Sequence, residues 1–445
     1  MMVAEADSRL ANRILIALLA GAAAGVLVLG VGGRFPAVLG TARSLSTTVL
    51  DPFGQVFLRL LFFVVVPLIF ASLANGVLQL GRLGNLGPLA ARTFSLFVAN
   101  MAIAAVLGLA MMNLLDPGGR IDPATQAELA VQYGGAAQGH IETRAHQPAM
   151  SLSTLVQIFM PRNLLGSVVG NDRDLLGEML PLIVFALLIG AAGTKLDSVK
   201  RDMLRAGLEL VTELMTGLVH FALKLAPYAV PAMIFSVVVK IGFDSLYALG
   251  VFVGGTLAVM ALHLFGTLSL WLKLGTRYRP LHFFKQISPV LVTAFSTSSS
   301  NATLPASLAT AREVLGIRPI TAGFVLPLGA TMNMSGTALF EGCVVLFVAQ
   351  VFGVELTLGQ QLMLVILSVL SAVAVAGIPG GSLPVVAGLL VTFGLPPEGI
   401  GIVLGVDRLL DMARTTLNVG ADLVTAAIVD EQTPVVDAGP GSQGG

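Results

Sequence analysis

The sequence predicts an all-α polytopic membrane protein, from its composition and from the apolar runs that recur along it. Only 11% of its 445 residues are charged, whereas 55% are hydrophobic and the mean hydropathy is +0.89. An ordinary soluble domain has about 25% charged residues. Most of the uncharged runs are about 20 residues or longer, the length that crosses a bilayer. They lie at 14–33, 60–81, 93–115, 179–194, 245–272, 319–340 and 356–397.

The distribution of Lys and Arg predicts the orientation. Arg9 and Arg13 precede the first run and place residues 1–12 in the cytoplasm. The first run has no clear A-x-A cleavage site, so a retained helix is favoured over a signal peptide. We therefore expect a multi-pass protein of the cell (inner or cytoplasmic) membrane. Alternating spans put the loops richest in basic residues on the cytoplasmic side, at 82–92, 195–205 and 273–285.

Two polar segments are expected to lie outside the helical core. The stretch 117–150 is rich in Gly, Ala and Gln and is predicted to be an external loop, and the tail 431–445 is predicted to be disordered. No soluble domain, phosphate-binding glycine motif or zinc-type Cys/His cluster is visible, and Cys343 is the only cysteine. ATP-driven transport and a bound cofactor are therefore not expected. The net charge is zero, so no nucleic-acid partner is expected either.

Two of the later segments do not read as simple spans. The uncharged stretch 286–311 is interrupted by consecutive small polar residues at 296–301, and 356–397 is too long for one crossing and contains the Gly- and Pro-rich run 377–382. Each predicts a helical hairpin that enters and leaves on one side, and paired breaks of this kind indicate a substrate site. The alternatives are a loop outside the bilayer for the first break and a kink or turn for the second.

A third cluster of small polar residues lies between these breaks. The segment LPLGATMNMSGT at 326–337 places Asn, Ser, Gly and Thr in the middle of an apolar run. An unwound turn there would expose carbonyl oxygens to a cation. Close packing of helices through small residues explains the same composition equally well.

The last apolar segment carries the densest set of charges. Asp411, Arg414 or Thr415, Asn418 and Asp422 are spaced so that they share one helix face. A charge at the bilayer centre costs at least about 2.5–3.5 kcal/mol, so this face indicates a binding site. A structural ion pair between Asp411 and Arg414 is the alternative, but it explains neither Asn418 nor Asp422. Two further charges precede this face: Asp407 is expected to be structural, and Arg408 to lie near the membrane edge.

Five motifs together resemble the glutamate transporter family, the dicarboxylate/amino acid:cation symporters, over nearly the whole chain. They are FVVVPLIFASLANG (63–76), STSSSNATLP (296–305), LPLGATMNMSGT (326–337), AGIPGGSLP (376–384) and DRLLDMARTTLNVGAD (407–422). The resemblance implies eight transmembrane helices plus two re-entrant helical hairpins, a homotrimer, and an elevator-type transporter. In that mechanism a transport domain moves across the membrane against a trimerisation scaffold.

The resemblance also implies a division of the chain. The scaffold would comprise helices 1 and 2 (13–80) and helices 4 and 5 (151–240). The transport domain would comprise helix 3 (90–116) and the segment 243–430. That segment would hold helix 6, hairpin 1 (281–312), helix 7 (317–345), hairpin 2 (358–393) and helix 8 (397–430).

Substrate roles follow residue by residue from the same resemblance. Arg414 would pair with the side-chain carboxylate of the substrate, as suits a planar guanidinium in a partly dry site, and Asp411 would bind its amino group. The remaining implied substrate contacts are Ser299, Ser300, Thr337, Gly377, Ile378, Ser382, Thr415 and Asn418. One sodium site would be formed by Gly329, Asn333, Asn418 and Asp422, and another by Thr331 with the backbone near 371–375.

The chain departs from the family pattern at the ion sites. Ser335 stands where the family has an aspartate of a third, buried sodium site, and Phe97, Asn100 and Met101 stand where hydroxyl ligands of that site are expected. We therefore expect that site to be absent. Glu341 matches a glutamate that some members use for proton coupling, because a buried carboxyl group favours its neutral, protonated form. A solvated position at a helix end is the alternative.

These observations predict a secondary active symporter for an acidic amino acid, L-aspartate or L-glutamate, with sodium ions or protons as coupling cations. A four-carbon dicarboxylate symporter is the main alternative, although such members tend to lack an aspartate at position 411. A neutral amino acid carrier, an anion channel and a membrane enzyme are less favoured. His282 is the histidine nearest to the serine run, and no Ser-His-Asp arrangement is visible. The expected partners are the substrate, the cation, the lipid bilayer and two further copies of the chain.

Overall fold

The computed structural model describes most of the chain, and helices are the regular secondary structure of that part. Its described residues are 2–80, 87–119, 121, 126, 162–164, 179–241, 243–373, 375 and 380–433. Within these ranges no residue is in a β-strand. The all-α fold class is confirmed, whereas the number of spans, the re-entrant hairpins and the trimer stay predictions. The external loop 117–150 and the tail 431–445 lie largely outside the described residues.

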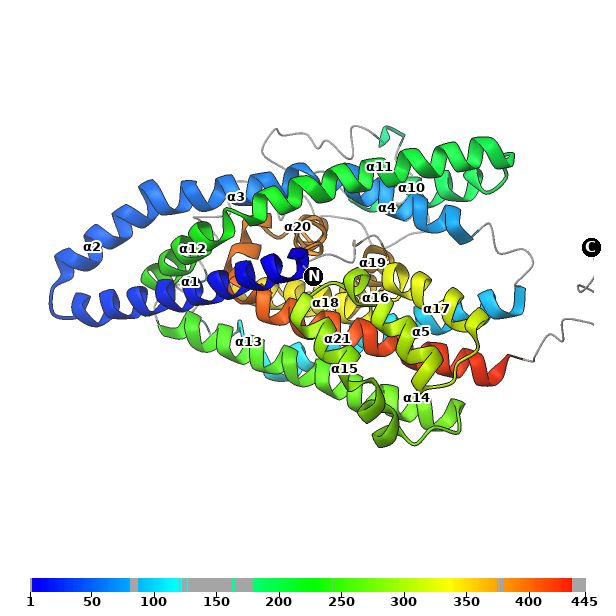
Figure 1. Cartoon of the computed structure of the whole chain (residues 1–445). Coiled ribbons are helices and arrows are strands. Elements are labelled where there is room, and N and C mark those ends of the chain that lie inside the picture. Colours follow the sequence, from blue (N-terminus) through cyan, green and yellow to red (C-terminus); the bar gives the residue numbers. More distant parts are fainter. Residues whose placement is uncertain are drawn as a thin grey trace, which may run out of the picture.

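One group of helices comes from residues 2–80 and 179–241. It comprises α1 (Met2–Gly32), α2 (Pro36–Leu45), α3 (Asp51–Phe63), α4 (Val65–Leu80), α10 (Met179–Gly193), α11 (Ser198–Leu223) and α12 (Ala226–Ile241). Helix α1 packs along α12, and α4 packs on α10 and α11. In Figure 1, α3, α4, α10 and α11 run along one long side of the molecule.

The remaining helices form the larger body in which the candidate site lies. They are α5 (Gly87–Leu115), α13 (Phe243–Leu262), α14 (Leu268–Gly275), α15 (Pro280–Thr297), α16 (Ser300–Ala309), α17 (Pro319–Met332), α18 (Ser335–Val351), α19 (Leu358–Ala372), α20 (Leu383–Thr392) and α21 (Ile400–Gln432). Three π-helical turns interrupt the described helices, at Ser46–Leu50, His263–Thr267 and Thr310–Val314. Figure 1 shows α18 and α21 in the interior of this body.

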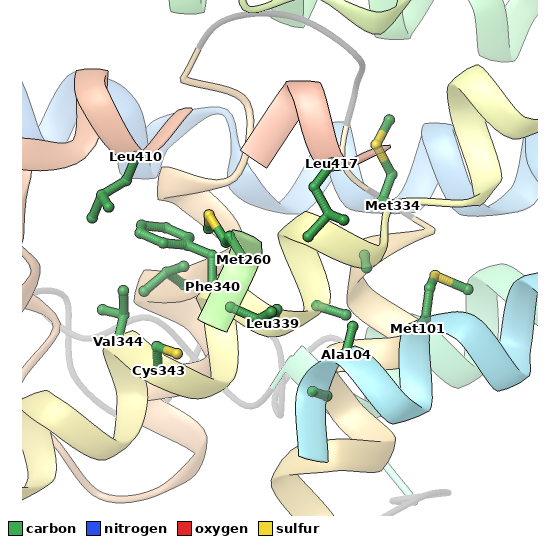
Figure 2. Close-up of a cluster of buried hydrophobic side chains, with 14 of the residues drawn as sticks. Met101, Ala104, Met260, Met334, Leu339, Phe340, Cys343, Val344, Leu410 and Leu417 are labelled. Carbon is green, nitrogen blue, oxygen red and sulfur yellow. The ribbon is translucent and has the colours of Figure 1, made fainter. Parts of the chain in front are cut away.

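Helix α18 is buried on all sides because it packs against α5, α19, α20 and α21. Figure 2 shows its Leu339, Phe340 and Val344 in one buried cluster with Met101 and Ala104 from α5 and with Leu410 and Leu417 from α21. All of these side chains are buried. These apolar side chains are thus used for packing, and they fix α18 and α21 against one another.

Three helical stretches in the described part are long and apolar enough to cross a membrane. They are Leu89–Leu115, Leu246–Gly275 and Pro319–Val351, and shorter apolar helices accompany them. The third stretch is interrupted at Asn333 and Met334, whose backbone angles are not helical. This is the unwound turn that the small polar residues at 326–337 suggested.

Helical structure is also interrupted in both segments where hairpins are expected, 281–312 and 358–393. Ser298 takes a left-handed conformation (φ 50°) between α15 and α16, which pack against each other. Residues 380–382 form a turn before α20, and Gly380 has a φ of 72° there, a value that favours glycine. These breaks shape the candidate site described next.

Candidate functional site

The unwound turn between α17 and α18 lies directly against the polar face of α21. The backbone N–H of Gly336 donates to Asn418 Oδ1 at 2.7 Å, and Asn418 Nδ2 lies 3.5 Å from Thr337 Oγ1. A Cβ atom at position 336 would come within 2.5 Å of the backbone oxygen of Arg414. Glycine at this position therefore allows the two helices to approach closely, so the unwound turn and small-residue packing both occur here.

We expect Gly336→Ala to destabilise the protein by about 1–3 kcal/mol, because overpacking forces backbone shifts. The added methyl group would meet backbone atoms of Arg414, which cannot rotate away. The measurement is the thermal unfolding midpoint of the purified protein in detergent. Gly342→Ala is the matched control in the same helix, since its Cβ would lie an ordinary 3.5 Å from Leu109. Equal midpoints for the two variants would contradict the close approach.

Arg414 is buried and surrounded by partners of several kinds. It donates hydrogen bonds to Ser382 Oγ and Asp411 Oδ1. Its guanidinium carbon lies 4.6 Å from the centroid of the Phe340 ring, within the range of a cation–π interaction. Asp407 Oδ1 lies 4.0 Å from Arg414 Nη1. The guanidinium is thus held in one place by an aromatic face and two carboxylates.

Asp411 connects α21 to the turn before α20. Its Oδ2 accepts a hydrogen bond from the backbone N–H of Gly380 at 3.1 Å. Arg408, expected near the membrane edge, has a side chain only 10% exposed, with Nη1 3.7 Å from Asp411 Oδ2. Its Nε and Nη2 atoms are buried without a hydrogen-bond partner in the described part. Both ions of the Asp411–Arg414 pair therefore touch the segment 380–382.

The tip between α15 and α16 supplies a helix N-terminus. Ser299 caps α16, and its Oγ accepts from the backbone N–H of Ala302 at 3.2 Å. Ser299 and Ser300 are both buried, and α16 packs against α17 and α21. Backbone N–H groups and the helix dipole at such an N-terminus favour an anion. Thr337 and Thr415 are buried on α18 and α21, respectively.

The C-terminal end of α17 lies beside the Asp422 carboxylate. Asn333 Nδ2 donates to Asp422 Oδ1 at 2.9 Å. A side chain at Gly329 would overlap the Asp422 carboxylate, so the backbone of α17 lies next to that group. No three His, Cys, Asp or Glu side chains gather as metal ligands in the described ranges. A cation at this place would depend on Asp422 and on backbone carbonyl oxygens, which are suitable ligands for a hard ion.

The other predicted ion residues make hydrogen bonds that do not involve Asp422, or none among the described residues. Thr331 Oγ1 donates to Leu328 O in its own helix at 3.0 Å. Ser335 is fully buried, and its hydroxyl has no hydrogen-bond partner in the described part. Glu341 is buried in the middle of α18, which removes the alternative of a solvated helix end. Its Oε2 accepts from Ser371 Oγ of α19 at 2.6 Å, while Oε1 has no partner among the described residues.

The structure therefore brings most of the predicted residues into one body. Gly377 and Ile378 lie outside the described residues. Sequence reasoning did not single out His263, whose Nε2 lies 2.9 Å from Asn100 Oδ1, nor Phe340 and Gly380. The available signal for His263 was its position as an ionisable residue inside the apolar run 245–272.

Comparisons with known proteins agree on one family. The family described as "Sodium:dicarboxylate symporter family" matches residues 10–432. The proton/sodium-glutamate symport protein of Bacillus subtilis (strain 168) is 32% identical over 424 residues, which cover 95% of this chain and 92% of that protein. The proton/glutamate-aspartate symporter of Escherichia coli (strain K12) is 29% identical over 86% of this chain and 85% of that protein. The C4-dicarboxylate transport protein of Deinococcus radiodurans is 29% identical over 87% and 84%, respectively.

Proposed function

We propose, because the chain belongs to the sodium:dicarboxylate symporter family, that it is a secondary active symporter for L-aspartate or L-glutamate. Relatives named as glutamate and aspartate symporters support this choice of substrate. The family places the protein in a membrane, and the apolar helices fit that location. An elevator movement in a homotrimer belongs to the same proposal, with α1–α4 and α10–α12 as the scaffold and the larger body as the transport domain.

The observation that carries the proposal is the adjacent pair Asp411 and Arg414. An acidic amino acid presents an ammonium group and a second carboxylate, which are opposite in charge to Asp411 and Arg414, respectively. In the present structure the two residues pair with each other. A bound substrate would replace each partner with a group of the same charge, so few interactions would be lost on binding. Since Gly380 and Ser382 contact the same two residues, the segment 380–382 would close over the ligand.

The α-carboxylate of the substrate would bind at the tip formed by Ser299 and Ser300. The N-terminus of α16 offers backbone N–H groups there, and a helix N-terminus favours negative charge. Thr337, Thr415 and Asn418 would supply further hydroxyl and amide contacts. Gly377 and Ile378 would complete the cover formed with Ser382, as the resemblance implies.

The coupling cation would bind beside Asp422, with Gly329, Asn333 and Asn418 as neighbours. Thr331 would belong to a second site with the backbone near 371–375. Ser335 lacks the charge that a third sodium site requires, so we infer that this site is lost. A proton on Glu341 would compensate, because burying an ionised carboxylate with one unpaired oxygen is costly.

We expect Glu341→Gln to remove the pH dependence of L-aspartate uptake, because glutamine can neither bind nor release the proton. The measurement is initial uptake into proteoliposomes at several external pH values with the membrane potential clamped. Glu355→Gln is the control, since Glu355 is exposed and should keep the wild-type pH profile. A Glu341→Gln variant with the wild-type profile would show that the proton travels elsewhere or not at all.

The proposed function is tested by uptake of labelled L-aspartate and L-glutamate into proteoliposomes. We expect accumulation against a gradient when an inward sodium gradient or an inward proton gradient is imposed. If neither gradient drives accumulation, the proposal of a cation-coupled symporter is wrong. Current that does not depend on substrate, without accumulation, would favour an anion channel instead.

A four-carbon dicarboxylate symporter is the second candidate, and the similarity to a C4-dicarboxylate transport protein favours keeping it. Arg414 would serve either substrate, whereas Asp411 favours the one with an ammonium group. Competition separates the two candidates. Inhibition of L-aspartate uptake by succinate at lower concentration than by unlabelled aspartate would favour the dicarboxylate.

A further inference from the structure

A chain of hydrogen bonds crosses four structural elements and ends at the candidate cation site. It joins His263 of the π-helical turn, Asn100 of α5, Asn333 at the break after α17, and Asp422 of α21. His263 Nε2 lies 2.9 Å from Asn100 Oδ1, Asn100 Nδ2 lies 3.0 Å from Asn333 Oδ1, and Asn333 Nδ2 lies 2.9 Å from Asp422 Oδ1. All four side chains are buried.

These hydrogen bonds are all donated in the same direction, from His263 towards Asp422. An amide oxygen can only accept, so His263 must carry its proton on Nε2 and donate to Asn100. Asn100 then donates to Asn333, and Asn333 donates to the Asp422 carboxylate. Each amide uses its oxygen for the preceding donor and an N–H for the following acceptor. Hydrogen bonds aligned in this way polarise and strengthen one another.

This direction determines how Asn333 faces the cation ligand. An amide can rotate by 180° and exchange its oxygen and nitrogen at little cost in shape. With Asn100 as a donor to its oxygen, Asn333 presents an N–H to Asp422. Without that donor the Asn333 oxygen would be buried and unpaired, so the amide would be held less firmly beside Asp422. His263, at one end of these hydrogen bonds, therefore influences how Asn333 is held beside Asp422 at the other end.

The placement of His263 is a second feature of this arrangement. It begins the π-helical turn His263–Thr267, in which its carbonyl oxygen accepts from the backbone N–H of Leu268, five residues later. Turns of this kind are rare and frequently occur at functional sites. His263 is completely buried, and its Nδ1 has no partner in the described part. The ring is thus held by a single directed hydrogen bond.

We propose that His263 is a positioning residue for cation coupling: through Asn100 it fixes the orientation of the Asn333 amide beside Asp422. The proposal rests on the proposed function, because it assigns a role in the affinity for the coupling cation. His263 itself contacts neither cation nor substrate. Residues that hydrogen-bond to metal ligands without contacting the metal commonly lower metal affinity by about 10–100-fold when they are replaced.

The test compares His263→Leu with His263→Gln in the purified full-length protein. Leucine cannot donate to Asn100, whereas glutamine places an N–H near the position of Nε2. Thr256→Val is the control, since Thr256 is also buried on α13 and lies two turns before His263. The measurement is the cation concentration that gives half-maximal L-aspartate uptake, together with the KM for aspartate at saturating cation and the thermal unfolding midpoint.

For His263→Leu we expect the half-maximal cation concentration to rise by about tenfold or more, with little change in the KM for aspartate at saturating cation. His263→Gln and Thr256→Val should stay close to the wild type. A folded His263→Leu protein with an unchanged cation requirement would overturn the proposal, as would equal effects of the Leu and Gln variants.

Asn100→Leu provides a second test if His263→Leu does not fold. Leucine is close in shape to asparagine and adds no charge but cannot donate to Asn333 Oδ1, so the cation requirement should rise although His263 is intact. An unchanged cation requirement in this variant would also overturn the proposal. If the wild type accumulates substrate with neither cation gradient, the proposed function fails, and that outcome is distinct from coupled transport that the variants leave unaltered.

Discussion

Arg414→Ala is expected to weaken binding of L-aspartate or L-glutamate by about thirtyfold or more, because truncating one partner of a buried, hydrogen-bonded charge pair costs about 2–5 kcal/mol. The guanidinium is the only group of the pair that can pair with a substrate carboxylate. Its loss would also leave Asp411 without the partner that it has in the present structure. Isothermal titration calorimetry in detergent measures the effect at saturating cation.

Two further variants show whether the geometry of Arg414 or only its charge is required. Arg414→Lys keeps the charge but loses the planar fork that holds a carboxylate by two hydrogen bonds, so we expect it to restore binding only in part. Arg318→Lys is the control, because Arg318 pairs with Asp430 near the C-terminal end of α21, the helix that carries Arg414. Normal affinity of Arg414→Ala would show that the acidic substrate was assigned to the wrong residue.

The sequence predicts the breaks in this fold better than the partners that meet across it. Local chemistry sets the breaks: the serine run permits the left-handed turn at Ser298, and small polar residues permit the unwound turn at Asn333. Likewise, the spacing of Asp411, Arg414, Asn418 and Asp422 places them on one face because they belong to a single helix. Features that depend on a few neighbouring residues are therefore accessible from sequence.

Contacts between helices follow from the rotation and depth of each helix, which hydrophobic spacing does not determine when the whole helix is apolar. His263 illustrates this limit, because its partner Asn100 is 163 residues away. The same holds for Glu341 and Ser371, which belong to α18 and α19. The burial of the Arg408 side chain against Asp411 likewise depends on the helices packed around α21.

The two predicted roles of α21 come together in the arrangement of its neighbours. Its first half faces the segment 380–382 through Asp411 and Arg414, and its second half faces the break after α17 through Asp422. Asn418 lies between them and holds the backbone N–H of Gly336. A displacement of α17 or α18 on cation binding would therefore reach the proposed substrate residues through one helix. This connection gives a physical route for coupling the two ligands.

Asp422→Asn is expected to abolish cation-driven accumulation while leaving the fold nearly intact. Asparagine has the same shape and can still accept the hydrogen bond from Asn333, but it removes the negative charge that attracts a cation. Two neighbours of Asp422 in the structure, Gly329 and Asn333, carry no charge. We therefore expect that substrate affinity of this variant no longer responds to the coupling cation.

The decisive measurement is substrate affinity as a function of cation concentration, since it separates lost coupling from lost binding. In the wild type, affinity for L-aspartate should rise with the cation, whereas in Asp422→Asn it should stay at the low, cation-free value. Asp430→Asn is the matched control, because Asp430 is an acidic residue of the same helix that pairs with Arg318 away from the site. If Asp422→Asn keeps the full cation response, the cation binds elsewhere, and the carboxylate beside Gly329 would then serve only to hold Asn333.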